Sequence, residues 1–181
     1  MGPDRPDRPA PPDAGAVSDP GPLSDQGPLS GQGPLSDQGP WSDPGVALGR
    51  LHAAMRRPAF NAWLGVQAVA ADPVRRTVIV TMPLRPEMCH DPDQRLAHGG
   101  VVAALIDVAG YAAVSVWQDG ATPTITLQVE YLAPATGPVL RAEGRLRKLG
   151  RSIGRADVEV FSGDRLVALG RGSFSTGGLA T

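Results

Sequence analysis

The most hydrophobic segment of the chain is residues 101–117, whose sequence VVAALIDVAGYAAVSVW is apolar on nearly every helical face. Its length and its Ala and Leu content favour a helix over a strand. A helix that is apolar on all sides is buried on most of them, so the rest of the domain has to cover it. We expect this helix to begin at the tripeptide His98-Gly99-Gly100.

Downstream of this helix the hydrophobic residues recur at every second position, which predicts strands with one apolar and one polar face. Ile125, Leu127, Val129 and Tyr131, for example, alternate with polar residues. Such alternation is typical of an antiparallel sheet with one face on the core. Strands are expected at residues 125–131, 140–147, 156–160 and 166–174, and upstream at 63–70 and 74–82, with a short helix at 46–57.

One buried helix and about six strands have a simple solution, in which the sheet curls around the helix and covers its apolar surface. The predicted fold class is therefore α+β, with a single domain over residues 46–181.

Residues 1–45 have a different composition, rich in Pro, Gly, Ser and Asp. A six-residue unit of the GPLSDQ type recurs between Gly21 and Pro44. Each unit offers one Leu or Trp beside a proline, which is too little apolar surface to offset the entropy of ordering the chain. We expect this segment to be a disordered, low-complexity tail.

The composition excludes several classes of function. A net charge of −1 gives no electrostatic footprint for nucleic acid. The single cysteine, Cys89, excludes an intrachain disulfide and a multi-cysteine metal site. No secretory signal opens the chain, and the apolar stretch at 101–117 is too short to span a bilayer. We expect a soluble, cytoplasmic protein with no metal, cofactor, nucleic-acid or membrane partner.

Candidate chemistry lies on the apolar helix. Asp107 is the only ionisable carboxylate between residues 101 and 117, and an ionised Asp on an apolar helix is costly unless it is paired or functional. Gly99 and Gly100 have no side chains to cover their backbone N–H groups at the helix start, where unpaired donors and the positive end of the dipole can stabilise an oxyanion. Eight residues, roughly 12 Å of helical rise, separate Gly99 from Asp107. An antiparallel helix from a second subunit would bring one chain's Asp107 opposite the other's glycines.

The residues also carry a family resemblance over positions 46–176. The strings HGGVVAALIDVAGYAA and TPTITLQVEYLAPATG, with VTMPLRPEM upstream and RLVALGRGSF downstream, resemble the motifs of PaaI-like hotdog thioesterases. This resemblance implies the hotdog fold, in which an antiparallel sheet wraps around a long central helix. It also implies hydrolysis of acyl-CoA or acyl-carrier thioesters without a cofactor, in a homodimer or a dimer of dimers.

The resemblance assigns roles to several residues. The Gly99 N–H, together with that of Gly100, would polarise the thioester carbonyl. Asp107 of the partner subunit would act either as a general base toward water or as a nucleophile. Thr124 lies where the family often has a Thr or Ser near the reacting centre, although an ordinary strand threonine is an equal alternative.

The chain departs from the family pattern at one position. Relatives often carry an Asn six residues before the His of His-Gly-Gly, but Pro92 stands there. His90 is a candidate substitute for that Asn, since histidine can donate, accept or shuttle a proton, or it is an exposed loop histidine. His98 would orient the loop or contact substrate, or it supports the site structurally, which is the preferred interpretation.

A basic hairpin follows the central strands. Arg147 and Arg151 either lie on a solvated strand face or bind the phosphates of coenzyme A. Competing hypotheses for the whole chain are a hotdog dehydratase or hydratase, a non-catalytic acyl-CoA-binding module, and a scaffold that works through its repeat tail.

Overall fold

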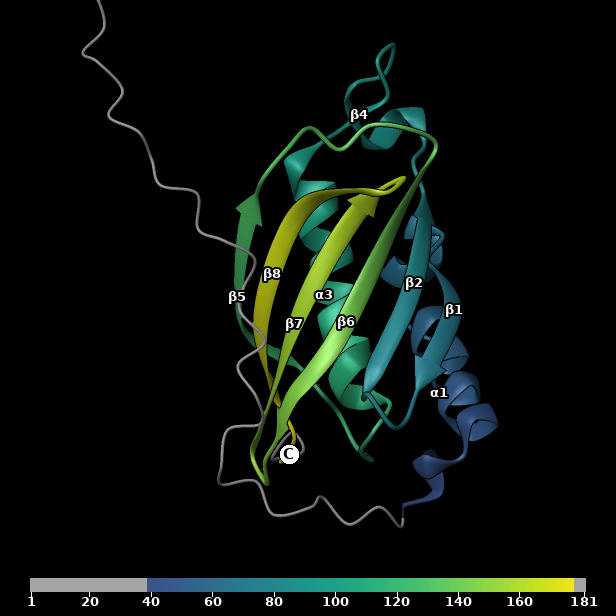
Figure 1. Cartoon of the computed structure of the whole chain (residues 1–181), viewed down its shortest axis with the longest axis vertical. Coiled ribbons are helices and arrows are strands. Elements are labelled where there is room, and N and C mark those ends of the chain that lie inside the picture. The colour runs from purple at the N-terminus through teal and green to yellow at the C-terminus, as the bar shows by residue number, and fades with distance from the viewer. Residues whose placement is uncertain (1–38, 178–181) are drawn as a thin grey trace, which may run out of the picture. The chain divides into compact units, whose positions relative to one another are not determined.

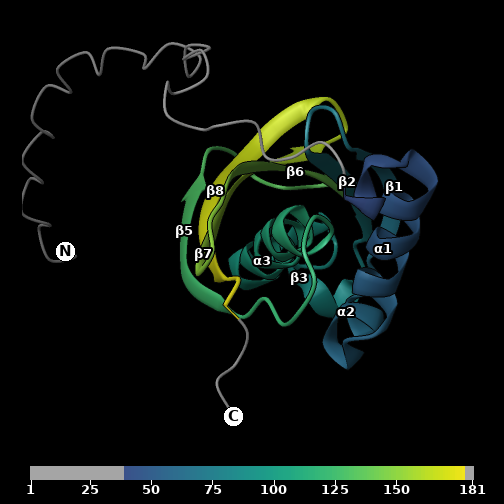
Figure 2. The same cartoon turned by 90° about the horizontal axis from the view of Figure 1, so that it is seen from below.

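The computed structural model describes residues 39–177, in which six antiparallel strands curl around helix α3 (Gly99–Ser115), as Figures 1 and 2 show. The α+β class predicted from the sequence is thus confirmed. The other elements are η1 (Pro40–Ser42), α1 (Pro44–Arg56), α2 (Ala59–Leu64), β1 (Gln67–Asp72), β2 (Thr77–Pro83), η2 (Pro86–Met88), β3 (Cys89–Asp91), β4 (Leu96–Ala97), β5 (Thr124–Tyr131), β6 (Val139–Leu149), β7 (Ile153–Ser162) and β8 (Arg165–Ser175).

The strand order of the sheet is β1-β2-β6-β7-β8-β5, and every neighbouring pair is antiparallel. Strand β5 follows α3 in sequence but pairs with β8, the last strand, at one edge of the sheet (Figure 1). The opposite edge is β1, against which α1 packs. The strands β3 and β4 form a separate small hairpin just ahead of α3.

The sheet holds α3 closely because glycines stand where the helix approaches the strands. A Cβ atom at Gly144 of β6 would lie 2.6 Å from the carbonyl oxygen of Ala109, and one at Gly170 of β8 would lie 2.1 Å from a methyl carbon of Ile106. Both distances are shorter than van der Waals contact, so a side chain at Gly144 would require the helix backbone to move and one at Gly170 would require the Ile106 side chain to move. The close approach leaves the inner faces of α3 fully buried, including Leu105, Ile106 and Ala109.

Arg50 of α1 makes hydrogen bonds to the C-terminal end of α3 and the residues that follow it. Its guanidinium donates to the Ser115 carbonyl at 3.3 Å, to the Gln118 carbonyl, and to the Asp119 carboxylate at 2.9 Å. The ring of Trp41 lies 5.6 Å from the guanidinium carbon on another side. Carbonyl groups at a helix C-terminus have no partner within the helix, so this arginine satisfies groups that would otherwise stay unpaired.

Two boundaries differ from the sequence predictions. The strand predicted at 63–70 is wrong in its first part, because α2 continues to Leu64 and β1 begins only at Gln67. Pro58 stands at the N-cap of this short helix, and Gly65 ends it in a left-handed conformation with φ +74°. Helix α1 begins at Pro44, two residues before the predicted domain boundary, and η1 (Pro40–Ser42) also lies within the segment predicted as a disordered tail. Residues 1–38 of that segment lie outside the described residues.

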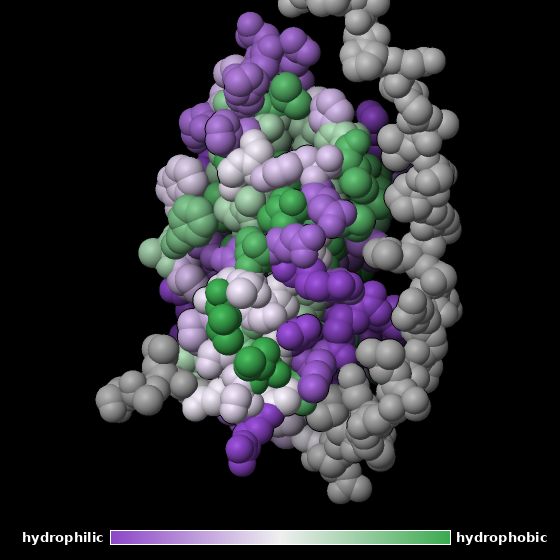
Figure 3. Space-filling view, turned by 90° about the vertical axis from the view of Figure 1, so that its left-hand side faces the viewer, coloured by the Kyte–Doolittle hydropathy of each residue, from purple (hydrophilic) through white to green (hydrophobic). Residues whose placement is uncertain are grey.

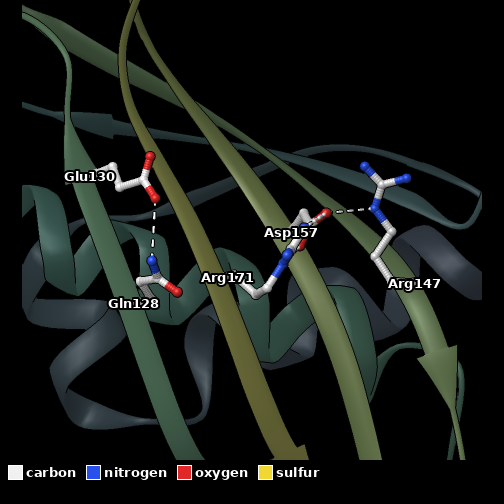
Figure 4. Close-up of polar contacts among 5 residues, drawn as sticks. All are labelled: Gln128, Glu130, Arg147, Asp157 and Arg171. Atoms are coloured by element: carbon white, nitrogen blue, oxygen red, sulfur yellow. Dashed lines mark hydrogen bonds and ion pairs between the residues drawn. The ribbon is translucent and has the colours of Figure 1, made fainter. Parts of the chain in front are cut away.

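Charged side chains form a network on the outer face of the sheet (Figure 4). Asp157 of β7 accepts hydrogen bonds from Nε of Arg147 at 2.7 Å and from Nε of Arg171 at 2.7 Å. Partial burial alone would raise the pKa of Asp157, but the hydrogen bonds and charges of the two arginines outweigh it and hold this pKa below the ordinary value of 3.8.

This network predicts a pH-dependent contribution to stability. A carboxyl group whose pKa is lower in the folded state stabilises the protein above its ordinary pKa, and this contribution is lost as the pH falls through the folded-state pKa. We expect Asp157→Asn to lower the free energy of unfolding by about 1 kcal/mol at pH 7, the upper range for half-exposed ion pairs. The difference from the wild type should shrink as the pH falls below 3.8, the ordinary pKa of the group.

Urea denaturation at pH 7 and at pH 3 measures both differences. Asp164→Asn, in the exposed turn between β7 and β8, is the matched control and should be close to neutral at both pH values. An Asp157→Asn difference that does not change with pH would contradict this assignment.

Candidate active site

The N-terminus of α3 presents one backbone donor that the protein does not use. His98 is the N-cap residue, with extended backbone, and its Nδ1 accepts the Gly100 N–H at 3.0 Å. The His98 carbonyl accepts the Val101 N–H at 2.9 Å. Within residues 39–177 no group accepts the N–H of Gly99. His98 therefore has a capping role, the predicted second donor at Gly100 is already occupied, and Gly99 is left as the open donor.

Tyr131, the last residue of β5, positions this donor. Its hydroxyl donates to the Gly99 carbonyl oxygen at 2.8 Å, which ties the end of the edge strand to the start of the helix. Beside this contact lies a cleft of about 320 Å³ with mostly apolar walls. We call it the glycine cleft; it is lined by Leu96, Ala97, Gly99, Val102, Tyr131, Leu132, Ala133, Pro134, Ala135 and Val167.

Asp107 lies two turns further along α3 and is half-buried. The hydroxyl of Thr124, the first residue of β5, donates to Oδ1 of Asp107 at 2.8 Å. Its other carboxylate oxygen, Oδ2, accepts no hydrogen bond from the described residues. Asp107 and Thr124, which were predicted separately as site residues, are thus in direct contact, with one carboxylate oxygen held in place and the other left open.

A second cleft, of about 360 Å³, opens beside this carboxylate. We call it the aspartate cleft; it is lined by Pro58, Asn61, Asp107, Val108, Tyr111, Ala121, Thr122, Pro123 and Thr124. The two clefts share no lining residue. Eight residues of straight helix, about 12 Å of rise, separate Gly99 from Asp107, so one chain does not bring these two groups together.

The remaining predicted site residues lie outside both clefts. His90 is exposed on β3, and its ring centre lies 6.5 Å from that of His98, which places it at the glycine end of α3. Arg147 pairs with Asp157 on the outer face of the sheet (Figure 4). Arg151 is exposed in the turn between β6 and β7. Neither arginine lines the glycine cleft or the aspartate cleft.

Sequence reasoning missed three residues that the structure places at the clefts. Tyr131 was treated as a strand residue, and only the tertiary fold reveals its bond to Gly99. Asn61 lies between the helix predicted at 46–57 and the strand predicted at 63–70 and received no assignment from the sequence, whereas the structure places it on the buried face of α2. Tyr111 could have been found, since it lies four residues after Asp107 and therefore on the same face of α3.

Two properties of the described residues concern metal binding and membrane insertion. Within 39–177, no group of three or more His, Cys, Asp or Glu side chains could hold a metal ion. None of the helices in that range is long and apolar enough to cross a membrane.

Comparison with known proteins identifies the family. The family model described as the thioesterase superfamily matches residues 95–169, which include Gly99, Asp107 and Thr124. The X-ray structure of a protein from the thioesterase superfamily is 32% identical, with a TM-score of 0.67 over 72% of this chain and 98% of that one. The chain belongs to the thioesterase superfamily. The family resemblance predicted from the sequence is therefore confirmed.

Other relatives of this thioesterase-superfamily chain agree with the assignment. The PaaI protein of the phenylacetic acid degradation operon of E. coli is 24% identical, with a TM-score of 0.63 over 73% of this chain and 94% of that one. At that identity the likeness shows the hotdog fold alone. A Halobacterium salinarum protein named as a candidate esterase is 37% identical over 100 residues, or 47% of this chain. Those residues span 63% of the length of that relative.

Proposed function

We propose that this protein hydrolyses acyl-CoA or acyl-carrier thioesters at a site shared by two subunits. The observation that carries the proposal is the pair of unused groups on α3 of a thioesterase-superfamily chain. The Gly99 N–H is open beside one cleft, and Oδ2 of Asp107 is open beside the other. An N–H at a helix N-terminus can stabilise the oxyanion formed during hydrolysis of a thioester, and a carboxylate can serve as the base or the nucleophile.

The proposed chemistry assigns one role to each group. The Gly99 N–H donates to the thioester carbonyl oxygen and stabilises the negative charge that develops there, helped by the dipole of α3. Asp107 either takes a proton from a water that attacks the carbonyl carbon or attacks that carbon itself to form a mixed anhydride that water then cleaves. In both routes the C–S bond breaks, the sulfur leaves as a thiolate that gains a proton, and the acyl group becomes a carboxylic acid. Thr124 holds the carboxylate in orientation.

The two ends of β5 support a site made by two chains. Thr124, at the start of this strand, contacts Asp107, and Tyr131, at its end, contacts Gly99. Two β5 strands that paired antiparallel about a two-fold axis would set the Thr124 end of one strand against the Tyr131 end of the other. This pairing would bring Asp107 of one chain to the Gly99 N–H of its partner.

The surface of β5 fits such an interface. Strand β5 pairs on one side only, with β8, and leaves a row of unpaired backbone groups at the other side. Ile125 is 53% exposed and Tyr131 57% exposed. Figure 3, which views the side of the molecule where β5 lies, shows hydrophobic and neutral residues beside hydrophilic ones. On α3, the small residues Gly100, Ala103 and Ala104 are incompletely buried and leave room for a second helix. The proposed assembly is a homo-oligomer, either this dimer or a dimer of two such dimers.

Two peripheral roles belong to the proposal as well. Arg151, exposed in its turn, is proposed to bind coenzyme A phosphates, and Arg147 would do so while it also pairs with Asp157. His90 is proposed to act at the glycine end of the site, in place of the family's Asn, because it lies close to the capping residue His98. We propose a cytoplasmic protein, where acyl-CoA substrates are available.

The experiment that tests the function is thiol release by purified protein from short, long and aromatic acyl-CoA substrates. We expect steady-state release with at least one class of acyl group. His90→Ala should lower kcat tenfold or more if this histidine takes part in proton transfer, and unchanged kinetics would remove it from the site. Tight acyl-CoA binding without release would instead favour the non-catalytic binding module, for which the missing Asn gives the motivation.

A further inference from the structure

The two clefts differ in the chemistry of their walls. The glycine cleft is lined by Leu96, Val102, Leu132, Val167 and neighbouring small residues, with the ring of Tyr131 at one side. The aspartate cleft contains side chains with hydrogen-bonding groups from three different elements of the chain, beyond the catalytic carboxylate itself. A thioester substrate has the same asymmetry, because an acyl group lies on one side of the reacting carbonyl and an amide-bearing arm lies on the other.

Asn61 supplies the first of these groups. Its side chain is only 6% exposed, and its Nδ2 donates to the Ala54 carbonyl oxygen at 3.0 Å. That bond fixes the orientation of the amide and leaves Oδ1 without a donor among the described residues. Asn61 Oδ1 is not among the fully buried side-chain atoms without a partner, so it keeps contact with solvent at the aspartate cleft and is free to accept a hydrogen bond from a ligand there.

Tyr111 supplies the second group. It lies one helical turn beyond Asp107, where residues four apart have Cβ atoms about 5–6 Å from each other. Its ring is partly buried against the core, and no described residue makes a hydrogen bond to its hydroxyl. The aspartate cleft thus offers an acceptor at Asn61 and a donor at Tyr111, a turn away from the reacting carboxylate.

We propose that the aspartate cleft binds the first amide of the pantetheine arm and that the partner's glycine cleft receives the acyl group. This inference rests on the proposed thioesterase function and adds the orientation of the substrate to it. The amide N–H would donate to Oδ1 of Asn61, and the amide carbonyl would accept from the Tyr111 hydroxyl. In acyl-CoA two methylene groups separate this amide from the sulfur. That separation is comparable with the one helical turn that separates Tyr111 from Asp107.

The same assignment specifies the acyl class. The glycine cleft is apolar and, at about 320 Å³, lies at the lower end of the roughly 300–1,000 Å³ range of ligand pockets. It therefore fits a short or medium acyl group without polar substituents, since a buried hydroxyl would find few partners there.

The test compares thioesters of one acyl group with different thiols. Hexanoyl-N-acetylcysteamine contains the pantetheine amide, whereas S-butyl thiohexanoate has a thiol portion without it. We expect wild-type kcat/KM to be at least tenfold higher for the amide-containing substrate. Tyr111→Phe removes one hydroxyl and keeps the ring, and it should reduce this ratio about tenfold, as should Asn61→Leu.

The ratio of the two kcat/KM values is informative because a general loss of folded protein lowers kcat/KM for both thioesters equally and leaves their ratio unchanged. Equal wild-type kcat/KM for the two thioesters, or a ratio that neither variant alters, would overturn the inference while the thioesterase activity stands. Failure to hydrolyse any thioester, including acyl-CoA, would instead remove the proposed function. A Tyr111→Phe effect confined to hydroxylated acyl groups would also overturn the inference about substrate orientation, because that result would place the acyl group in the aspartate cleft.

Discussion

Replacement of Asp107 by Asn is expected to lower kcat for thioester hydrolysis by about 10²–10⁴-fold, the range for a group that transfers a proton in the reaction. The asparagine keeps the size of the side chain, and its Oδ1 can still accept from the Thr124 hydroxyl. It cannot take a proton from water, and it is a poor nucleophile. Steady-state thiol release from acyl-CoA measures the loss.

The matched control for this prediction is Asp164→Asn, which makes the same chemical change in an exposed turn. It should leave kcat and KM at the wild-type values. KM should change little in Asp107→Asn, since the carboxylate acts on the reacting atoms rather than in ground-state binding. Turnover within a few-fold of the wild type would contradict any catalytic role for Asp107.

Gly99→Pro is the second large expected effect, because it removes the open N–H, puts the ring Cδ atom in place of the hydrogen and keeps the helix. Gly99 is the first residue of α3, where proline is well tolerated and where the N–H makes no bond within the helix. The preceding residue, His98, already has the extended backbone that proline requires, with φ −65° and ψ 136°. We expect kcat to fall by about 10²–10³-fold, as it does when one oxyanion donor is removed.

Gly99→Ala separates the loss of the donor from the effect of added atoms. An alanine Cβ would lie 3.5 Å from the ring of Tyr131, an ordinary van der Waals contact, and the N–H is retained. We expect this control to keep most of the activity that Gly99→Pro loses. Equal losses in the two variants would point to steric obstruction and contradict a role for the N–H.

The same two variants test whether the site is shared between subunits. A co-expressed mixture of Asp107→Asn and Gly99→Pro chains would contain mixed dimers, in which one of the two sites takes Gly99 from the first chain and Asp107 from the second. With random pairing, half of the dimers are mixed and each has one intact site, so we expect about a quarter of the wild-type rate. A mixture no more active than the separate variants would contradict a site shared between Gly99 of one chain and Asp107 of the other.

The fold was largely predictable because its periodic segments are long and strongly patterned. Residues 101–117 predicted α3, and the alternation after residue 124 predicted β5 to β8, since burial on one face imposes that alternation. The segment at 63–70 was less predictable. Its apolar residues fit a strand by composition, while Pro58 and Gly65 make the first part a short helix.

The candidate site was predictable only where its residues lie close in sequence. Asp107 and Gly99 stand out on one helix, and Thr124 was placed by its motif. The contact of Tyr131 with Gly99 and the bond of Asn61 to Ala54 depend on how the edge strand and α2 pack against the rest of the domain. No local pattern specifies such contacts, so they appear only in the folded chain.

The contact between Arg50 and Trp41 places the last unit of the repeat within the folded domain. The last repeat unit reads GPWSDP, and its Trp41, which stands where the earlier units have Leu, lies against Arg50. Its Asp43 accepts the Val46 N–H at 2.9 Å and caps α1. The last copy of the repeat is thus part of the folded domain. A truncation at residue 45, where composition changes, would cut into the domain, whereas one at residue 38 would leave that unit whole.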